Sequence, residues 1–521
     1  MRAGARLETR SGWIEGAIEE PEAAGGRALR VFRGVPYARP PLGALRWAPP
    51  AREAAWRGVR EALAFGPSAP QRPSVLMRML GMEGGPGHDE DCLTLCVWTP
   101  ARVEEGLDGG RRPVLVWLHG GAFTGGGCAL PVYDGGALAR RGDVVVVTIQ
   151  YRLGALGWLV LPELLDAGEA GANFGLLDQI AALGWVREHA ERLGGDPERV
   201  TVFGESAGAM SIGALLGAPA ARGLFARAVL QSGAADNVTP RAGAERVAAS
   251  FRAALGGGPR DLAALRALPA EAILGAQQRA ADESWRHVEG LAFQPVCEEG
   301  AAAAVLPRPP LAAVAGGAAA GVAVLAGTNR DEWRLFALAD PKLAGLDDGA
   351  FVRRVLRAPP RGVGDPHAFA RRALAGYRAA RPEAPPRELW LAFQTDRVFR
   401  IPALRLLAAQ RPHEPQSFAY LFTWASPALD GRLGACHALE VPFVFGRVDG
   451  PRAAPLVGAG PEARRLSERM MDAWLAFARD GDPGWPAWDD AKRATMVLGR
   501  ESALAWDPDG AERRIWEPVT G

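Results

Sequence analysis

The sequence predicts an α/β protein in which helices flank a large, mainly parallel central sheet. Short apolar runs rich in β-branched residues recur along the chain, and segments with helical spacing of apolar residues separate them. Two later regions contain helical patterns without strong strands, which indicates helices inserted between the strands. Together these observations are typical of a doubly wound fold with added helices.

The strands are predicted where an apolar run ends at Gly, Asn or Asp, or near another turn signal. Runs that are apolar throughout indicate strands that are buried on both faces, as in parallel sheets. Five such runs are PVLVWLH from Pro113, DVVVVTI from Asp143, RVTVF from Arg199, RAVLQ from Arg227 and GVAVLAG from Gly321.

A helix is predicted over residues 175–195, in GLLDQIAALGWVREHAERLGG, between two of these strands. Its apolar residues, such as Leu176, Ile180 and Leu183, recur at near-helical spacing, and two glycines at its end form a plausible stop. The alternation of strand and helix supports the doubly wound arrangement.

The two regions without strong strands span roughly residues 241–280 and 347–412. In the second region, FVRRVLRAPP and ELWLAFQTDRVFRIPALRLLAAQ are typical of amphipathic helices interrupted by prolines. No repeat or low-complexity linker separates these regions from the rest of the chain. We therefore expect one domain over residues 1–521, with both regions inserted above the sheet as a helical cap.

Composition and charge exclude several classes of partner. The chain has 60 Lys and Arg against 59 Asp and Glu, a net charge of +1, which provides no field to attract nucleic acid or an anionic membrane. The N-terminal stretch lacks the apolar centre of a signal peptide, and no apolar run is long enough to span a bilayer, so we predict a soluble, cytoplasmic protein. The five cysteines lack disulfide-framework and metal-site spacing, which predicts free, mostly buried thiols.

FGESAGAM, residues 203–210, places Ser206 between Gly204 and Gly208 directly after a predicted strand. The small residues that follow are able to begin a helix, which completes the strand, turn and helix of a nucleophile elbow. Glycines suit both flanking positions because neighbouring backbone would clash with a Cβ. The alternative, in which Ser206 only caps a helix, predicts no further catalytic residues elsewhere.

A glycine-rich loop, LHGGAF at residues 118–123, follows the strand that begins at Pro113. In the α/β-hydrolase fold, a loop at this position contributes donors to the oxyanion hole. We expect the backbone N–H groups of Gly121 and Ala122 to join that of Ala207 around the oxyanion. Taken alone, the two glycines could equally form a plain turn at the end of a strand.

A serine nucleophile also needs a histidine base, which follows the serine in this fold. Three of the four downstream histidines, His287, His367 and His413, lie in charged or proline-rich surroundings typical of a solvated surface. His437, in GACHALEVPFVFG, enters an apolar run after the predicted strand SFAYLF. We therefore predict that His437 is the base.

The orienting carboxylate is expected between the nucleophile and the base in the sequence. GVAVLAGTNRDEW offers Asp331 and Glu332 directly after a predicted strand. Periodicity does not choose between these two carboxylates, and a solvated acidic pair is the plainer alternative.

These motifs belong to a series of blocks that resembles the type-B carboxylesterases, the family that includes bacterial para-nitrobenzyl esterases and the cholinesterases. The blocks are FRGVPYARPPLGALRW, EDCLTLCVWTP, HGGAF, YRLGALGWL, NFGLLDQIAALGWV, FGESAGAMS, LFARAVLQSGA, GTNRDEW, CHALEVPFVFG and AWLAFARDGDP. They cover nearly the whole chain. The resemblance implies that Ser206 is the nucleophile, His437 the base and Glu332 the acid, in an acyl-enzyme mechanism that needs no metal or cofactor.

The chain departs from this family's pattern at several positions. Ala69 stands where many relatives have a cysteine that bonds the cysteine of EDC, which leaves Cys92 without that partner and agrees with an intracellular setting. Residues 72–91 contain no aromatic residue, whereas cholinesterases have a tryptophan there that holds a quaternary ammonium, so choline esters are not expected as substrates. Trp333 stands where relatives usually have glycine, and Gln150 where they usually have asparagine.

The sequence therefore predicts a serine carboxylesterase that acts on small esters that are uncharged and partly apolar. One alternative is a noncatalytic, cholinesterase-like binding module, although such modules typically lack a triad residue and are secreted. Another is a hydrolase of amides, carbamates or lactones, because the same groups serve every acyl transfer. The sequence is compatible with a monomer or a small homo-oligomer.

Overall fold

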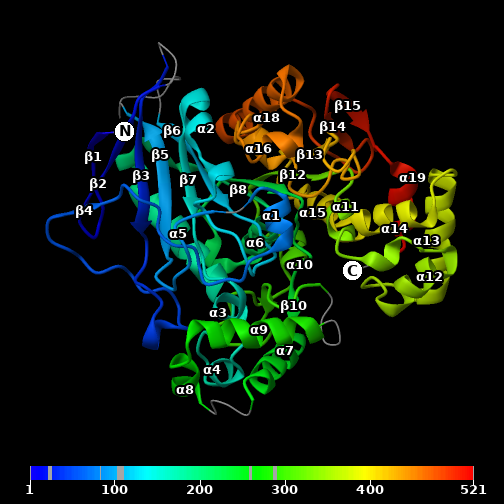
Figure 1. Cartoon of the computed structure of the whole chain (residues 1–521), viewed down its shortest axis with the longest axis horizontal. Coiled ribbons are helices and arrows are strands. Elements are labelled where there is room, and N and C mark those ends of the chain that lie inside the picture. The colour runs from blue at the N-terminus through cyan, green and yellow to red at the C-terminus, as the bar shows by residue number, and fades with distance from the viewer. Residues whose placement is uncertain are drawn as a thin grey trace.

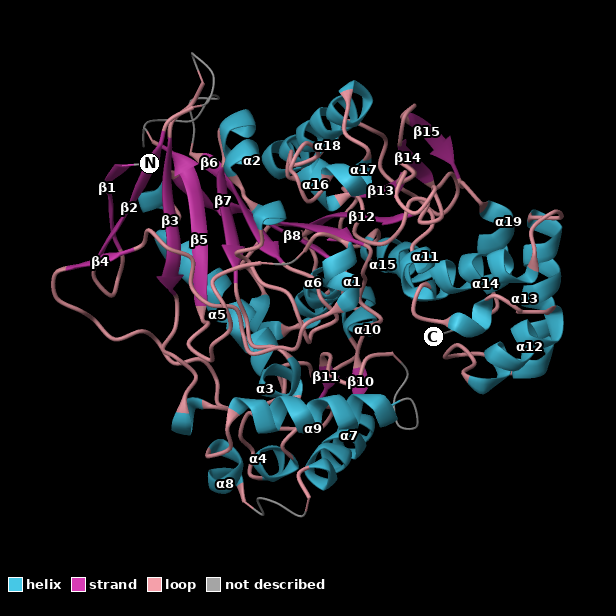
Figure 2. Cartoon of the chain, viewed as in Figure 1, coloured by secondary structure: helices cyan, strands magenta, loops and turns pink. Residues whose placement is uncertain are grey.

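A large twisted sheet forms the centre of the molecule, and helices pack on both of its faces (Figures 1 and 2). The computed structural model describes residues 2–21, 26–82, 84–101, 111–256, 261–284 and 290–519. Within these ranges, thirteen strands lie in the order β1-β2-β3-β5-β7-β6-β8-β9-β12-β13-β14-β15, with β4 beside β2. Their bounds are β1 Arg2–Glu8, β2 Trp13–Glu19, β3 Leu29–Pro36, β4 Val59–Glu61, β5 Thr94–Pro100, β6 Arg112–Leu118, β7 Val145–Ile149, β8 Gly195–Glu205, β9 Arg227–Gln231, β12 Ala323–Asn329, β13 Ser417–Phe422, β14 Ala494–Leu498 and β15 Ala503–Trp506.

The centre of the sheet is parallel, which confirms the predicted fold class. Each adjacent pair is parallel in the series β7, β6, β8, β9, β12, β13 and β14. All of them except β14 coincide with predicted apolar runs. Antiparallel strands extend the sheet at both edges, β1, β2, β3 and β5 at one and β15 at the other, and the sequence analysis did not predict these.

Alternate residues of β6 show how the two layers of helices are held. Val114, Val116 and Leu118 join a buried cluster with residues of α5, α6 and α15, whereas Leu115 and Trp117 join a second cluster with residues of α2, α16 and α18. Such continuous burial on both faces explains why the strand is apolar throughout. The helix bounds are α1 Val75–Met79, α2 Gly136–Gly142, α3 Gly154–Trp158, α4 Pro162–Asp166, α5 Phe174–His189, α6 Ala207–Gly217, α7 Arg241–Ala254, α8 Leu262–Arg266, α9 Ala270–Glu283, α10 Pro310–Ala315, α11 Trp333–Ala337, α12 Asp348–Arg357, α13 Pro366–Ala380, α14 Pro386–Thr395, α15 Ile401–Gln410, α16 Val441–Val444, α17 Ala454–Val457, α18 Pro461–Asp480 and α19 Gly510–Arg513.

The helix predicted over residues 175–195 is shorter in the structure. It ends at His189, and Glu191–Leu193 then form a single 3-10 turn. Gly194 adopts a left-handed backbone conformation with φ of 80°, and the chain enters β8 at the next residue. The first of the two glycines is thus the stop, and the second already belongs to the sheet.

The two regions expected as a cap contain helices. Residues 241–280 hold α7, α8 and most of α9, which Figure 1 shows grouped at the lower end of the molecule. Residues 347–412 hold α12, α13 and α14, a π-helical turn at Asp396–Arg400, and α15. The last of these helices, α15, packs on β12 and β13 and so covers the sheet.

We call α12, α13 and α14 the helical lobe, which lies at the right of Figure 1. The lobe has a buried cluster of its own, which includes Phe351, Phe369, Tyr377 and Phe393 and which Trp516 from the C-terminal segment completes. The lobe is therefore held together by its own apolar core.

All five cysteines are buried and free, as predicted. Among the described residues, no helix combines the length and the apolar character that crossing a membrane would require.

Candidate active site

Ser206 occupies the sharp turn between β8 and α6. Its backbone has φ of 54° and ψ of −123°, a conformation that residues with a side chain rarely adopt. Its N–H donates to the carbonyl of Gln231 at 2.9 Å, which ties the turn to the end of β9. Within residues 200–218, Ser206 is the one residue that is not buried. Ser206 is therefore the one residue of this stretch that is accessible from outside the core.

Close backbone contacts explain the two glycines beside Ser206. A Cβ at Gly208 would lie 2.0 Å from the carbonyl oxygen of Leu118, and one at Gly204 would lie 2.8 Å from the same oxygen. Such overlap would force β6 and α6 apart, and overpacking of this kind costs roughly 1–3 kcal/mol. The predicted reason for both glycines is confirmed.

Three backbone amides in or near the turn at Ser206 have no acceptor among the described residues. Gly121 and Ala122 have φ of 121° and 53°, so the loop after β6 turns sharply there. The loop lies against Ser206, since a Cβ at Gly120 would be 3.2 Å from the Cβ of Ser206. Among the described residues, no acceptor pairs with the N–H of Gly121, Ala122 or Ala207. These amides are free to bind a negatively charged oxygen.

Two glutamines hold the loop that carries these amides. The side chain of Gln71 accepts from the N–H of Gly126 and donates to its carbonyl, both at 2.8 Å. The side chain of Gln150 accepts from the N–H of Cys128 at 2.9 Å and donates to the hydroxyl of Ser68 at 3.0 Å. Gln150, one of the departures from the family pattern, thus connects the end of the loop to the segment around residue 68.

The structure pairs His437 with Glu332. Nδ1 of the imidazole lies 2.7 Å from Oε2 of Glu332, and this carboxylate is completely buried. The second oxygen, Oε1, accepts from the hydroxyl of Ser232 at 2.5 Å and from the N–H of Asn329 at 2.7 Å. Both oxygens of Glu332 are therefore held in place, and one of them orients the imidazole.

Asp331 faces away from the imidazole. Its Oδ2 accepts from the N–H of Ala435 at 3.0 Å, and its own N–H donates to the carbonyl of the same residue. Its other oxygen pairs with Arg334 at the surface. Of the two carboxylates that the sequence left open, Glu332 contacts His437, and Asp331 holds the loop on which His437 lies.

The other downstream histidines lie away from this site where they are described. His367 is exposed at the start of α13, and His413 contacts the carbonyl of Ala315 at 2.8 Å. His287 lies outside the described residues.

Glu205, which sequence reasoning missed, lies on the opposite side of the imidazole from Glu332. Its Oε1 is 3.0 Å from Nε2 of His437, and its side chain is buried. Between the described side chains of Ser206 and His437 the structure shows no hydrogen bond. His437 is therefore placed between two carboxylates, one of which belongs to the residue that precedes Ser206.

These charges alter the titration of His437. Burial opposes a charged imidazole, but Glu205 and Glu332 outweigh it and raise the pKa of His437 to about 9. Burial also raises the pKa of Glu205, to about 8, and the negative charges of Glu440 and Glu332 act in the same direction. Glu205 and His437 titrate as a pair that keeps a proton above neutral pH.

A buried network of hydrogen bonds connects Glu332 with a further carboxylate, Glu440. Glu440 accepts from the amide of Asn329 at 2.6 Å and from that of Gln231 at 3.0 Å, and its pKa is raised by burial. Asn329 therefore joins Glu440 to Glu332. Sequence reasoning also missed Ser232, Asn329 and Glu440. A signal existed for the first two, because they lie at the carboxyl ends of predicted strands, where ligands meet parallel sheets.

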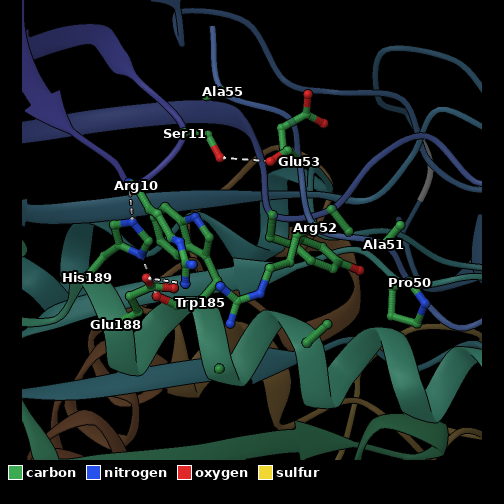
Figure 3. Close-up of a pocket in the computed structure, with 14 residues that line it drawn as sticks. Arg10, Ser11, Pro50, Ala51, Arg52, Glu53, Ala55, Trp185, Glu188 and His189 are labelled. Carbon is green, nitrogen blue, oxygen red and sulfur yellow. Dashed lines mark hydrogen bonds and ion pairs between the residues drawn. The ribbon is translucent and has the colours of Figure 1, made fainter.

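A separate surface pocket of about 480 Å³ lies along α5, and Figure 3 shows the residues that line it. His189 in this pocket stacks on Trp185, with ring centroids 4.2 Å apart. Its Nε2 accepts from the N–H of Arg10 at 3.0 Å, and its Nδ1 contacts the carbonyl of Trp185 at 2.7 Å. Both ring nitrogens are thus engaged with backbone, so His189 has a structural role and is not available as a base.

The fold and the site define a class of protein, the serine hydrolases of the α/β-hydrolase fold. The carboxylesterase family model matches residues 3–508, and the chain belongs to this family. It is a carboxylic-ester hydrolase.

Individual relatives match over nearly their whole length. The chain is 36% identical to the para-nitrobenzyl esterase of Bacillus subtilis strain 168, with 99% of each chain covered. It is 37% identical to the phenmedipham hydrolase of Pseudarthrobacter oxydans, with 95% of each covered. A solved structure of a PNB esterase superposes with a TM-score of 0.84 at 34% identity, with 99% of each chain covered. The predicted family and fold are confirmed.

The raised pKa of His437 predicts that ester hydrolysis becomes faster as the pH rises from 7 toward 9. As the predicted base, His437 accepts a proton only as a neutral imidazole, and the two carboxylates favour its charged form at lower pH. Glu205→Gln removes one of these charges, so the midpoint of the rise should move to lower pH by about one unit. Profiles of kcat/KM against pH for the wild type and the variant test this. Equal midpoints would show that Glu205 does not act on His437.

The contacts of the two neighbouring carboxylates predict unequal effects. Glu332→Gln should lower kcat by about a thousandfold or more, because the amide cannot stabilise a charged imidazole in the same way. Asp331→Asn should stay within about tenfold, because its amide oxygen still accepts from Ala435. Steady-state kinetics measures both, with circular dichroism to verify folding. The reverse order would transfer the acid's role to Asp331.

Proposed function

We propose that Ser206, His437 and Glu332 form the catalytic triad of this esterase, and that the amides of Gly121, Ala122 and Ala207 form its oxyanion hole. The substrates are small carboxylic esters that are uncharged and partly apolar.

The observation that carries the proposal is the isolation of one hydroxyl among unpaired amides. Ser206 is the one unburied residue in residues 200–218, and its neighbourhood contains the three N–H groups without acceptors. A fixed imidazole and carboxylate, 2.7 Å apart, stand beside the same turn. These groups are the ones that acyl transfer requires.

In the first half of the reaction, Oγ of Ser206 attacks the ester carbonyl carbon while Nε2 of His437 takes the serine proton. Nε2 turns from Glu205 to the adjacent residue, Ser206, for this step. The carbonyl electrons move to the oxygen, which the three amides stabilise. Collapse of the intermediate breaks the bond to the alcohol oxygen, and the imidazolium gives its proton to the leaving alcohol.

In the second half, a water molecule attacks the acyl carbon and His437 takes the proton of the water. The bond between Ser206 and the acyl group breaks, and the proton returns to Oγ. The carboxylic acid leaves, and the site regains its starting state. Glu332 orients the imidazole throughout and stabilises its charged form.

The charges around the site favour a neutral substrate. Glu205, Glu332 and Glu440 are all buried close to His437, and a carboxylate on the substrate would be placed near them. Apolar rings also contact the imidazole, since Phe336 and Phe399 lie within 5.0 Å of it, centroid to centroid. Both features support uncharged, partly apolar esters.

Ser206→Ala should lower the hydrolysis of p-nitrophenyl acetate and butyrate by at least about a thousandfold, because no other nucleophile takes its place. Ser502→Ala, in the turn between β14 and β15, is the matched control and should keep wild-type activity. Release of p-nitrophenol measures the rates, and circular dichroism verifies folding. Activity of Ser206→Ala near that of the control would refute the proposed nucleophile.

A further inference from the structure

Two phenyl rings enclose one side of the imidazole of His437. The ring centroid of Phe336 lies 5.0 Å from that of the imidazole, and the centroid of Phe399 lies 4.8 Å from it. The two phenyl rings are nearly parallel, at 13°, with centroids 6.0 Å apart. Phe399 is buried, whereas Phe336 is partly exposed. Phe336 is therefore the ring that offers apolar surface next to the reacting groups.

Trp333 packs against both phenyl rings. Its ring centroid lies 5.0 Å from that of Phe336 and 6.4 Å from that of Phe399. Trp333 itself does not pair with the imidazole. We call Trp333, Phe336 and Phe399 the aromatic wall.

The wall is built from two segments that are joined to each other. Trp333 and Phe336 lie on α11, which begins directly after Glu332, and Phe399 lies in the π-helical turn Asp396–Arg400. The N–H of Trp333 donates to the hydroxyl of Thr395, at the start of this turn, at 3.1 Å. A π-helical turn inserts a residue into a helix and re-aims its side chains, and such turns are frequent at functional sites.

A hydrogen bond also connects the π-helical segment Asp396–Arg400 to the helical lobe. Asp396 is buried and accepts from the hydroxyl of Tyr377 on α13 at 2.6 Å. That hydroxyl accepts from the indole N–H of Trp516 at 2.9 Å. Phe399 is therefore anchored to the lobe, and α11 is tied to the lobe as well, by the ion pair of Arg334 with Glu388 on α14 at 2.6 Å.

Trp333 packs against two buried clusters. One lies on the face of the sheet that α5, α6 and α15 cover, and the other is the core of the helical lobe. Its indole also contacts Phe336, so the size of the side chain at position 333 bears on the packing around Phe336.

We propose that the aromatic wall forms one side of the substrate pocket, and that Trp333 acts through Phe336 as a positioning residue that limits the length of the acyl chain. This inference rests on the proposed function. Phe336 contacts the apolar part of the substrate, and the wall restricts long esters relative to short ones.

The test compares kcat/KM for p-nitrophenyl octanoate with that for p-nitrophenyl acetate, as a ratio within each variant. Trp333→Ala should raise this ratio by about fivefold or more, because Phe336 gains room to withdraw. Trp333→Phe keeps a smaller ring in place and should give a ratio between those of the wild type and Trp333→Ala. Trp506→Ala, at an exposed position on β15, is the matched control and should keep the wild-type ratio.

Circular dichroism and Tm show which variants fold, and Trp333→Phe carries the test if Trp333→Ala does not. A graded rise supports the wall, whereas a ratio that is unchanged within twofold, or lowered, in the folded variants overturns it. A general loss of packing would lower both rates without a graded change in their ratio. Failure of the proposed function is distinct, because the wild type would then show no hydrolysis that depends on Ser206.

Discussion

The geometry of the site depends on the approach of Gly208 to the carbonyl of Leu118. This contact lets the start of α6 lie directly against the end of β6, with no room for a side chain between them. As a result, the turn that carries Ser206 and the loop that carries Gly121 meet at one point, although they come from different strands. One steric constraint in the backbone therefore brings Ser206 and the amides of the loop together before any side chain contributes.

Electrostatics imposes a second requirement, because the charges of the site are buried. Glu332 is stabilised by three hydrogen bonds from fixed partners, which offset part of the cost of removing a carboxylate from water. Oε1 of Glu205 has no hydrogen-bond donor beside it in the described part of the chain other than the imidazole, so a charged His437 stabilises its ionised form. The pair therefore resists losing its proton. A site that holds an imidazolium firmly suits the stage of the reaction at which this charge develops.

The sequence predicts the parts of this molecule that local pattern determines. Buried parallel strands are apolar throughout, so the centre of the sheet could be predicted, whereas the edge strand Trp13–Glu19 is only partly buried, which weakens its signal. The choice between Asp331 and Glu332 depends on which side of a turn faces His437, and periodicity contains no such information. Glu205 escaped notice because its contact joins residues that are 232 positions apart.

The helical lobe shows how a part of the chain remote from the chemistry can influence it. The lobe has its own apolar core, and the hydrogen bond from Tyr377 to Asp396 holds the π-helical turn that places Phe399 beside the imidazole. Glu332 directly precedes α11 as its N-cap residue, so the helix that carries Phe336 and the carboxylate that contacts His437 share one backbone segment. Hence one short segment contains both the carboxylate that contacts His437 and a phenyl ring that packs beside the imidazole. Under the proposed assignments, a change in α11 would act on substrate fit and on the orientation of His437 together, which would couple specificity to catalysis.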